Sequence, residues 1–356
     1  MDLSILIVNW NTRDRLAECL LSIRRTAQDI PHEVIVVDNA SADSSAKMVA
    51  SEFPEVLLVA SKENLGFARA NNVAFRKSRG RYLLLLNPDV VLLEGTVKGL
   101  VEFAEGRPDA GVVSPKLLNP DLSPQNYYGR IPTLSTVFFV YTRTGKWIDV
   151  HLFGGRIRRR DRYETYKDFD RPLALTDGGA AFCCTLIPRK VIEQIGFMDE
   201  RFPVFFNDGD FACRMFEAGY KAYIVPHLAA CHYGGASVKQ LSFGDYTKEW
   251  VYGLRAFYRK HKGRLYSTAA DLILATDLFY DLRDTCRDIL SGKSGPAGIS
   301  RPFRALRELL AYRPPNIPDE SLATSNQEAG SSRKGIKKIR SIPGMLARKL
   351  RPKNLQ

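Results

Sequence analysis

Polar residues follow four successive apolar runs in the first quarter of the chain. They are Asn9, Asp38, Asn64 and Asp89. In a parallel sheet, the segments that follow the strands meet at one edge, which is where open α/β sheets bind ligands. One such residue could simply satisfy backbone groups of its own turn. Four together predict a binding site.

Asp89 is the strongest candidate for chemistry. It ends an Asn-Pro-Asp turn directly after the unbroken apolar run 82–86, and a carboxylate there is a candidate ligand for a divalent cation that carries phosphates. The sequence contains neither GxGxxG after the first strand nor GxxxxGK[ST] anywhere, so phosphates would need a metal or cationic side chains. Asp38 stands where acidic residues recognise a ribose or base.

Three further segments carry candidate residues. Asn207, Asp208 and Asp210 precede a helical pattern, and because one carboxylate suffices as a cap, at least one lacks a structural reason. His232 lies beside glycines in an expected turn at 231–237, either as a ligand or as a structural histidine. Gly178 and Gly179 allow a close backbone approach or a bulge.

Strands and helices must position these residues. The pattern predicts strands at 3–8, 33–37, 56–59, 82–86, 111–114, 180–187 and 222–225. It predicts helices at 12–23, 43–51, 64–78, 94–104, 189–195, from Asn207 to Gly219, and through most of 245–290. The strict alternation at the start predicts a parallel, doubly wound α/β sheet. Residues 115–176 are expected to form an extended active-site loop with short helices.

Charge is concentrated at the C-terminus. The 356 residues carry a net +13, of which residues 333–356 contribute nine, and the remainder of the chain is only mildly basic at +4. We expect disorder from 314 onward, either as a solubilising tail or as a contact with anionic lipid. The basic run 156–162 predicts a solvated face, with phosphate or lipid head groups as the alternative.

The remaining features concern cellular setting. The six cysteines are expected to be mostly buried free thiols. We expect neither a signal peptide nor a membrane span, since no basic n-region and no run of about 18–20 apolar residues occurs. The aspartate stripe of the helix at 275–289 predicts packing on the body or on a second subunit rather than on an anionic bilayer.

Seven short motifs, each weak alone, occur in one order that is highly specific. Over about residues 3–260 they resemble the family 2 inverting glycosyltransferases of the GT-A fold, especially bacterial rhamnosyltransferase-like members. The motifs are VNWN (8–11), DNAS (38–41), NLGFARANN (64–72), LNPD (86–89), GGA (178–180), FFNDGDFACR (205–214) and HYGGAS (232–237).

The resemblance implies the domain organisation. It implies a GT-A domain at 1–240, with a nucleotide-binding half of about 1–114 and an acceptor half of about 115–240. A helical extension at 241–312 and a disordered basic tail at 313–356 would follow.

The resemblance also implies roles for individual residues. Asp89 would bind Mg²⁺ or Mn²⁺ as the last residue of a DxD-like motif, with Asn87 and Pro88 at its first two positions, and His232 would help. Asp208 would be the general base. The implied donor-binding residues are Asn9, Asp38, Asn64, Gly66, Asn71, Asn87 and Asp89, with Asn71 at a position often held by Arg. The implied acceptor-side residues are Gly178, Gly179, Asn207, Asp210 and Arg214, of which Asp210 and Arg214 would support the site.

The implied activity is inverting transfer of a sugar, with rhamnose from dTDP-rhamnose as the leading donor, to a glycan or lipid-linked saccharide. Asp208 would deprotonate the acceptor across the sugar from the metal, without a covalent intermediate. We expect a role in cell-envelope polysaccharide synthesis, in the cytoplasm or peripherally on the cytoplasmic membrane face, and no nucleic-acid partner. The alternatives are a nucleotidyltransferase and a catalytically silent glycan-binding protein.

Overall fold

The computed structural model describes residues 1–292 except 127, 162–169 and 237, and also residues 295, 299, 303, 307, 308, 311 and 312. Residues 1–317 form one compact unit, which is described below, and residues 318–356 are a separate unit. The expected tail from 313 onward lies outside the described residues.

The first 86 residues alternate strand and helix as predicted. The elements are β1 (Leu3–Asn9), α1 (Arg13–Thr26), β2 (His32–Asp38), α2 (Ser45–Glu52), β3 (Leu57–Ala60), α3 (Gly66–Lys77) and β4 (Tyr82–Leu86). The strands β1 to β4 pair in parallel. Along β1, Ile5 and Ile7 enter one apolar cluster whereas Leu6 enters another. A core therefore lies on each face of the sheet, which explains the unbroken apolar runs.

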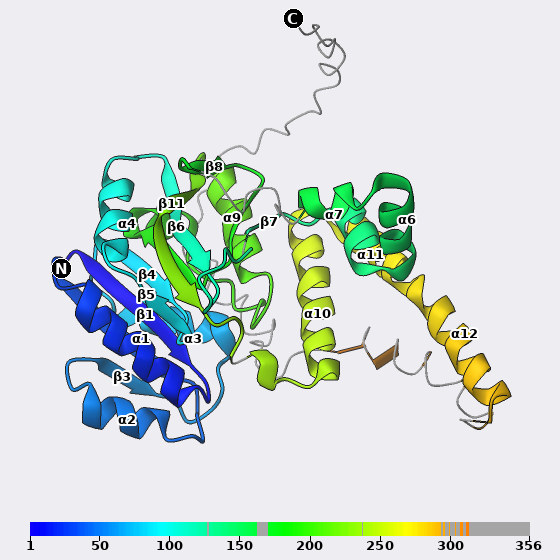
Figure 1. Ribbon diagram of the computed structural model, residues 1–356, viewed down its shortest axis with the longest axis horizontal. Coiled ribbons are helices and arrows are strands. Elements are labelled where there is room, and N and C mark those ends of the chain that lie inside the picture. Colours follow the sequence, from blue (N-terminus) through cyan, green and yellow to red (C-terminus); the bar gives the residue numbers. More distant parts are fainter. Residues whose placement is uncertain are drawn as a thin grey trace, which may run out of the picture. The chain divides into compact units, whose positions relative to one another are not determined.

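The central sheet is mixed. Its order is β3-β2-β1-β4-β10-β6-β11-β5, with β8 paired to β11 (Figure 1). The later strands are β5 (Val90–Leu92), β6 (Ala110–Leu118), β8 (Leu173–Leu175), β10 (Cys184–Pro188) and β11 (Lys221–His232). β10 runs antiparallel to β4 and β6, and β11 runs antiparallel to β5 and β8. Three helices lie between these strands in the chain: α4 (Thr96–Glu105), α8 (Arg189–Ile195) and α9 (Asn207–Glu217).

Three strand predictions are wrong in extent. The strand expected at 111–114 is β6, which continues to Leu118. The strand expected at 180–187 is two strands, because β9 (Gly178–Ala180) pairs with β7 (Tyr128–Arg130) in a separate small sheet before β10 begins. The strand expected at 222–225 continues past a register shift after Val225 and reaches His232. His232 therefore ends a strand and pairs opposite Val90 of β5, rather than lying in a turn.

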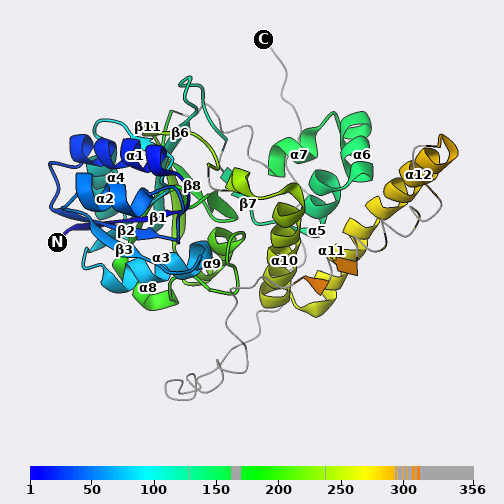
Figure 2. The same cartoon turned by 90° about the horizontal axis from the view of Figure 1, so that it is seen from below.

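Helices form a second lobe with its own core. They are α5 (Leu134–Thr136), the π-helical turn η1 (Val137–Tyr141), α6 (Arg143–Phe153), α7 (Arg156–Asp161), the 3₁₀ turn η3 (Val238–Gln240), α10 (Phe243–His261), α11 (Arg264–Ala275) and α12 (Asp277–Leu290). Val137 packs there with Leu254 and Phe257. Figure 2 shows α10 between the sheet and the other helices of this lobe. The helical region predicted at 245–290 is thus three helices.

Two aspartates of the α12 stripe contact α6 through half-exposed side chains, so the first of the two predicted arrangements, packing on the body, holds in part. Arg143, at the start of α6, lies 3.0 Å from Asp281 and 3.2 Å from Asp284.

Among the cysteines, Cys19, Cys183 and Cys184 are buried and free, whereas Cys286 is exposed, so the expectation of burial holds only in part. Across the described residues, none of the helices combines the length and apolar character needed to cross a membrane.

Candidate active site

A cavity of about 680 Å³ opens where β1, β2 and β4 end. Six of the predicted site residues line it: Asn64, Gly66, Asn87, Asn207, Asp208 and His232. Several polar or aromatic lining residues were not among the predicted set, among them Trp10, Asn39 and Glu249. Asn39 directly follows Asp38, so its position after a strand was the signal available in the sequence. The predicted edge of the sheet is therefore a real concave site.

Asn9 and Asp38 are buried and do not line this cavity. The Asn9 Nδ2 donates to Asp38 Oδ1 at 3.0 Å, and Asp38 Oδ2 accepts from the Ser41 backbone N–H at 3.1 Å. The Asn9 Oδ1 accepts from the Thr12 hydroxyl at 2.6 Å. These bonds tie the turn after β1 to the turn after β2 and so shape the edge on which a donor would lie.

The turn before α3 is held by two asparagines. Asn39 Oδ1 accepts from the Leu65 N–H at 2.7 Å, and Asn39 Nδ2 donates to Asn64 Oδ1 at 2.8 Å. Asn71, by contrast, donates its Nδ2 to the Phe67 carbonyl at 2.9 Å and does not line the cavity. Within α3, Asn71 thus supports the helix.

Gly66 brings the two halves of the site together. It has a φ of +72°, and a Cβ there would lie 3.0 Å from the Pro203 carbonyl oxygen. The same carbonyl accepts from the Phe67 N–H at 2.6 Å. The start of α3 therefore docks on the segment that leads to Asn207 and Asp208.

Asp89 and His232 meet because β5 pairs with β11. Asp89 Oδ1 lies 3.3 Å from His232 Nε2, and Asp89 Oδ2 accepts from the Ala236 N–H at 3.0 Å. Burial opposes ionisation of Asp89, but His232 and the backbone N–H outweigh it and hold the pKa of this carboxyl below its usual range. Asp89 is therefore a carboxylate at neutral pH, in contact with a histidine that lines the cavity.

Gln125 sets the tautomer of His232. Its Nε2 donates to Asn119 Oδ1 at 2.8 Å and to the His232 carbonyl at 3.1 Å, which turns its Oε1 toward His232 Nδ1 at 3.0 Å. Because an oxygen faces Nδ1, this nitrogen carries the hydrogen. Without a cation, a hydrogen on Nε2 as well lets His232 donate toward Asp89 at 3.3 Å and lowers the pKa of that carboxyl. A cation bound by both residues would take the place of that hydrogen.

The charge of the cavity also suits a cation. The described residues that line it include two carboxylates, Asp208 and Glu249, and neither Lys nor Arg. Among the described residues, no three His, Cys, Asp or Glu side chains gather into a metal-binding group. Asp89 and His232 offer a carboxylate oxygen and an imidazole nitrogen, and both suit Mn²⁺ or Mg²⁺ when phosphate oxygens complete the shell.

Asp208 lies in the first turn of α9, after Phe206, which has a φ of +68°. Its Oδ1 accepts from the Gly209 N–H at 2.8 Å. The side chain is half-buried, and this burial raises the pKa of the Asp208 carboxyl above its ordinary value. A raised pKa makes the carboxylate a better proton acceptor than a fully solvated aspartate.

Asp208 also lines a second cavity, of about 350 Å³. Gly178 and Gly179, which were predicted on the acceptor side, line this cavity with Trp250. Asp208 therefore lies where the two cavities adjoin.

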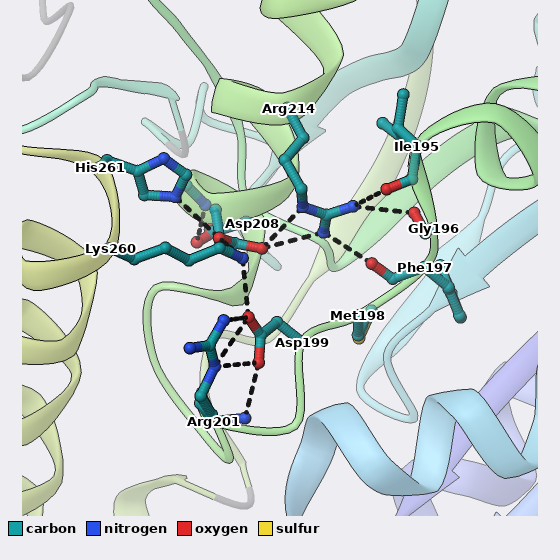
Figure 3. Close-up of polar contacts among 12 residues, drawn as sticks. Ile195, Gly196, Phe197, Met198, Asp199, Arg201, Asp208, Arg214, Lys260 and His261 are labelled. Carbon is teal, nitrogen blue, oxygen red and sulfur yellow. Dashed lines mark hydrogen bonds and ion pairs between the residues drawn. The ribbon is translucent and has the colours of Figure 1, made fainter. Parts of the chain in front are cut away.

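Asp210 and Arg214 line neither cavity. Asp210 is fully buried and contacts Lys260, His261 at 2.7 Å and Arg214 at 2.9 Å. Arg214 also donates to three carbonyl oxygens at the end of α8, those of Ile195, Gly196 and Phe197. Figure 3 shows Arg214, Lys260 and His261 converging from α9 and α10. Their position is that of supports which hold α9, and with it Asp208, against its neighbours.

Comparisons with known proteins identify the family that the chain matches. The model of a family described as glycosyl transferase family 2 matches residues 4–196, more than half of the chain. An N-acetylglucosaminyl-diphospho-decaprenol L-rhamnosyltransferase of Mycobacterium tuberculosis is 24% identical over 247 residues, which cover 65% of this chain and 76% of that protein. The low-salt glycan biosynthesis hexosyltransferase Agl10 of Haloferax volcanii is 24% identical over 60% of this chain and 61% of its own.

Two solved structures are similar in fold at low sequence identity. The mannosyltransferase PcManGT of Pyrobaculum calidifontis, in complex with GDP-Man and Mn²⁺, has a TM-score of 0.49 at 16% identity and covers 87% of each chain. S. aureus TarS, in complex with UDP-GlcNAc, has a TM-score of 0.46 at 17% identity and covers 91% of this chain and 83% of its own. The family match and the sheet described above confirm the predicted α/β fold of GT-A type.

Proposed function

The chain belongs to glycosyl transferase family 2, and from this premise we propose that it transfers a sugar with inversion from a nucleotide-diphosphate sugar to a saccharide acceptor. The cavity of about 680 Å³ would bind the donor, and the smaller cavity would bind the acceptor. Asp208 would be the general base.

The position of Asp208 between the two cavities is the observation that carries this proposal. In a direct displacement, the acceptor hydroxyl attacks the anomeric carbon from the face opposite the leaving diphosphate, and a base must take its proton there. Asp208 borders both cavities and belongs to a different segment from Asp89 and His232. Burial raises the pKa of the Asp208 carboxyl, which favours transfer of the acceptor proton to it. One step would then suffice, and no sugar–enzyme bond would form.

Asp89 and His232 would hold Mg²⁺ or Mn²⁺. When bound, the ion would neutralise the diphosphate and stabilise the negative charge of the leaving group. Gln125 would keep the His232 Nε2 lone pair available by accepting the hydrogen of Nδ1. Asn64, Asn87 and Asn207 would offer amide groups to the donor without adding negative charge to the cavity.

The mycobacterial relative supports the choice of substrates, since its name includes an L-rhamnosyl group and a diphospho-decaprenol-linked acceptor. We accordingly propose rhamnose from dTDP-rhamnose as the donor group. The acceptor would be a lipid-linked saccharide of cell-envelope polysaccharide synthesis, reached on the cytoplasmic face of the membrane.

The deciding experiment combines substrate screening with Asp208→Asn. Purified protein would be incubated with Mn²⁺, a lipid-linked N-acetylglucosamine acceptor and dTDP-rhamnose, UDP-GlcNAc or GDP-mannose, with nucleoside diphosphate release and product mass as the readouts. Removing a general base should lower kcat about 10²–10⁴-fold, while donor affinity stays near that of the wild type. NMR of the product should show the anomeric configuration opposite to that of the donor.

Asp14→Asn is the matched control, because Asp14 is a highly exposed aspartate at the start of α1. It should leave turnover unchanged. An unimpaired Asp208→Asn variant would refute the base assignment. Pyrophosphate release from a nucleoside triphosphate would instead identify a nucleotidyltransferase, and donor binding without turnover under all conditions would identify a silent binding protein.

A further inference from the structure

Helix α6 turns its apolar side chains outward. Trp147, Val150, Leu152 and Phe153 are 59%, 47%, 69% and 46% exposed, whereas Asp149 is fully buried. A surface helix of a water-soluble domain normally does the reverse, since burial of apolar area stabilises the fold. The orientation of α6 therefore needs a structural cause and points to a partner for the exposed face.

Backbone packing and a buried cap hold α6 in this orientation. Gly145 lies directly against the backbone of Phe138 in η1, where a Cβ would overlap the Phe138 carbonyl. On the same buried face, the two Asp149 carboxylate oxygens accept from the N–H groups of Ile157 and Arg158 at 3.0 and 3.1 Å. The inner face of α6 is thus occupied by close backbone contact and by the start of α7, which leaves the apolar residues outside.

Helix α7 places positive charge beside this apolar face. Arg156, Arg159 and Arg160 are exposed, and Lys146 is exposed on α6 itself. The acidic residues of α6 and α7 are Asp149, which is buried, and Asp161, the last residue of α7, against six Lys or Arg between 143 and 160. Figure 1 shows α6 and α7 side by side in the helical lobe. We call the exposed residues of α6 and α7 the α6–α7 face.

We propose that the α6–α7 face docks on a membrane surface that contains anionic lipids. Trp and Phe favour the boundary between head groups and acyl chains, and the arginines would meet the lipid phosphates. Charge disfavours a second copy of this chain as the occupant, because two such faces in a symmetric contact would bring their arginines together. None of the residues 143–160 lines either cavity, so docking leaves both cavities accessible.

This inference rests on the proposed function in one respect, since it would bring the acceptor cavity to the surface at which a lipid-linked saccharide is presented. It differs from the sequence prediction, which assigned lipid contact chiefly to the basic tail. The binding measurement below requires no sugar transfer, so either proposal can fail without the other.

Flotation of the full chain with vesicles of equimolar phosphatidylglycerol and phosphatidylcholine tests the inference. Two triple variants are compared with the wild type. The apolar variant carries Trp147→Ser, Leu152→Ser and Phe153→Ser. The arginine variant carries Arg156→Gln, Arg159→Gln and Arg160→Gln. Each arginine near an anionic surface contributes about five-fold in partition, so the arginine variant should bind at least about ten-fold more weakly. The apolar variant should lose a similar factor, and pure phosphatidylcholine vesicles should bind the wild type weakly.

Two control variants test whether binding depends on this face rather than on any exposed apolar side chains or any exposed positive charges. Leu265→Ser, Leu272→Ser, Phe279→Ser removes three residues that are 90%, 67% and 71% exposed on α11 and α12. Lys47→Gln, Arg76→Gln, Lys77→Gln removes three exposed charges from α2 and α3. Both controls should bind the anionic vesicles as the wild type does, and all variants should turn over a short water-soluble acceptor normally.

Undiminished binding by both α6–α7 variants would overturn the inference, as would equal losses in the controls. A dimer in sedimentation velocity that only the apolar variant converts to monomer, with vesicle binding unchanged, would show that the face is a subunit interface. A second measurement does not depend on weakened binding. Vesicles with spin-labelled lipid should quench wild-type fluorescence more than that of Trp147→Phe, and equal quenching would contradict the insertion of Trp147.

Discussion

His232 owes its tautomer to Gln125, a residue 107 positions earlier in the chain. Residues that orient a metal-bound histidine typically contribute 10–100-fold to metal affinity. We therefore expect Gln125→Leu to raise the Mn²⁺ concentration for half-maximal activity by about 10–100-fold, with kcat at saturating Mn²⁺ nearly unchanged. A titration of initial rate against Mn²⁺ measures both quantities.

The control for this variant is Gln28→Leu, which alters an exposed glutamine after α1 whose Nε2 bonds to the Arg24 carbonyl. It should give the wild-type titration curve. A lower kcat in Gln125→Leu with an unshifted Mn²⁺ dependence would mean that Gln125 acts otherwise than through His232.

At the scale of elements, α9 and α10 are joined by buried charges. Lys260 of α10 bridges Asp210 and Asp199, and Asp199 also pairs with Arg201 at 2.7 Å. Burial opposes ionisation of Asp210, but His261, Arg214 and Lys260 outweigh it and lower the pKa of this carboxyl. The same balance, with Arg201 and Lys260, lowers the pKa of Asp199. These pairs hold Asp208 in place without touching either cavity.

The Asp210→Asn variant tests these charged contacts between α9 and α10. Removal of one member of a buried ionic group leaves its partners uncompensated, so the free energy of unfolding at pH 7 should fall by about 3–5 kcal/mol. Glu18→Gln, in the exposed Arg15–Glu18 pair of α1, should have little effect. Urea denaturation followed by circular dichroism measures both variants.

The pH dependence of this effect has a definite sign. Because the folded pKa of Asp210 lies below the unfolded value of about 3.9, the stabilisation is present above that pH and is lost as the pH falls through the folded value. The difference in free energy of unfolding between the wild type and Asp210→Asn should therefore become smaller on acidification below about pH 4. A constant difference would mean that the variant acts through packing alone.

At the scale of the whole molecule, the larger cavity, proposed to bind the donor, is built from parts that fold onto one another. The sheet edge supplies Asn39 and Asn87, while α10 supplies Tyr246 and Glu249. A ligand in this cavity contacts both the sheet and the helical lobe, so its binding should stabilise the fold as a unit.

Thermal unfolding with donor and Mn²⁺ measures this coupling. At a donor concentration about 100-fold above Kd, the stabilisation should be about 2.7 kcal/mol, visible as a rise in Tm. Since the lining residues that are described include no Lys or Arg, the shift should vanish with chelator and in Asp89→Ala. Mn²⁺ alone and nucleotide sugar alone are the controls. An equal shift in chelator would exclude the metal from donor binding.

Part of this molecule could be predicted from local sequence. The alternation of strands and helices through β4 follows from short-range periodicity, and each apolar run reports its own burial. The residues after those strands then converge because parallel strands share an edge, which explains why Asn64, Gly66 and Asn87 line one cavity. Asp208 was predicted instead from the segment that begins α9. The match to the family model confirms the glycosyltransferase family that the motifs indicated.

Register and packing decided the rest. His232 reaches Asp89 through the pairing of β11 with β5, and Gln125 reaches His232 from the segment between β6 and β7. Asp208 and Asp210 are two positions apart, yet only Asp208 lines the cavities, because the first turn of α9 directs Asp210 toward α10. Contacts such as these depend on which distant segments meet. The sequence by itself therefore determined the types of residue and the edge on which they gather, while the tertiary structure alone decided which of them face the ligand.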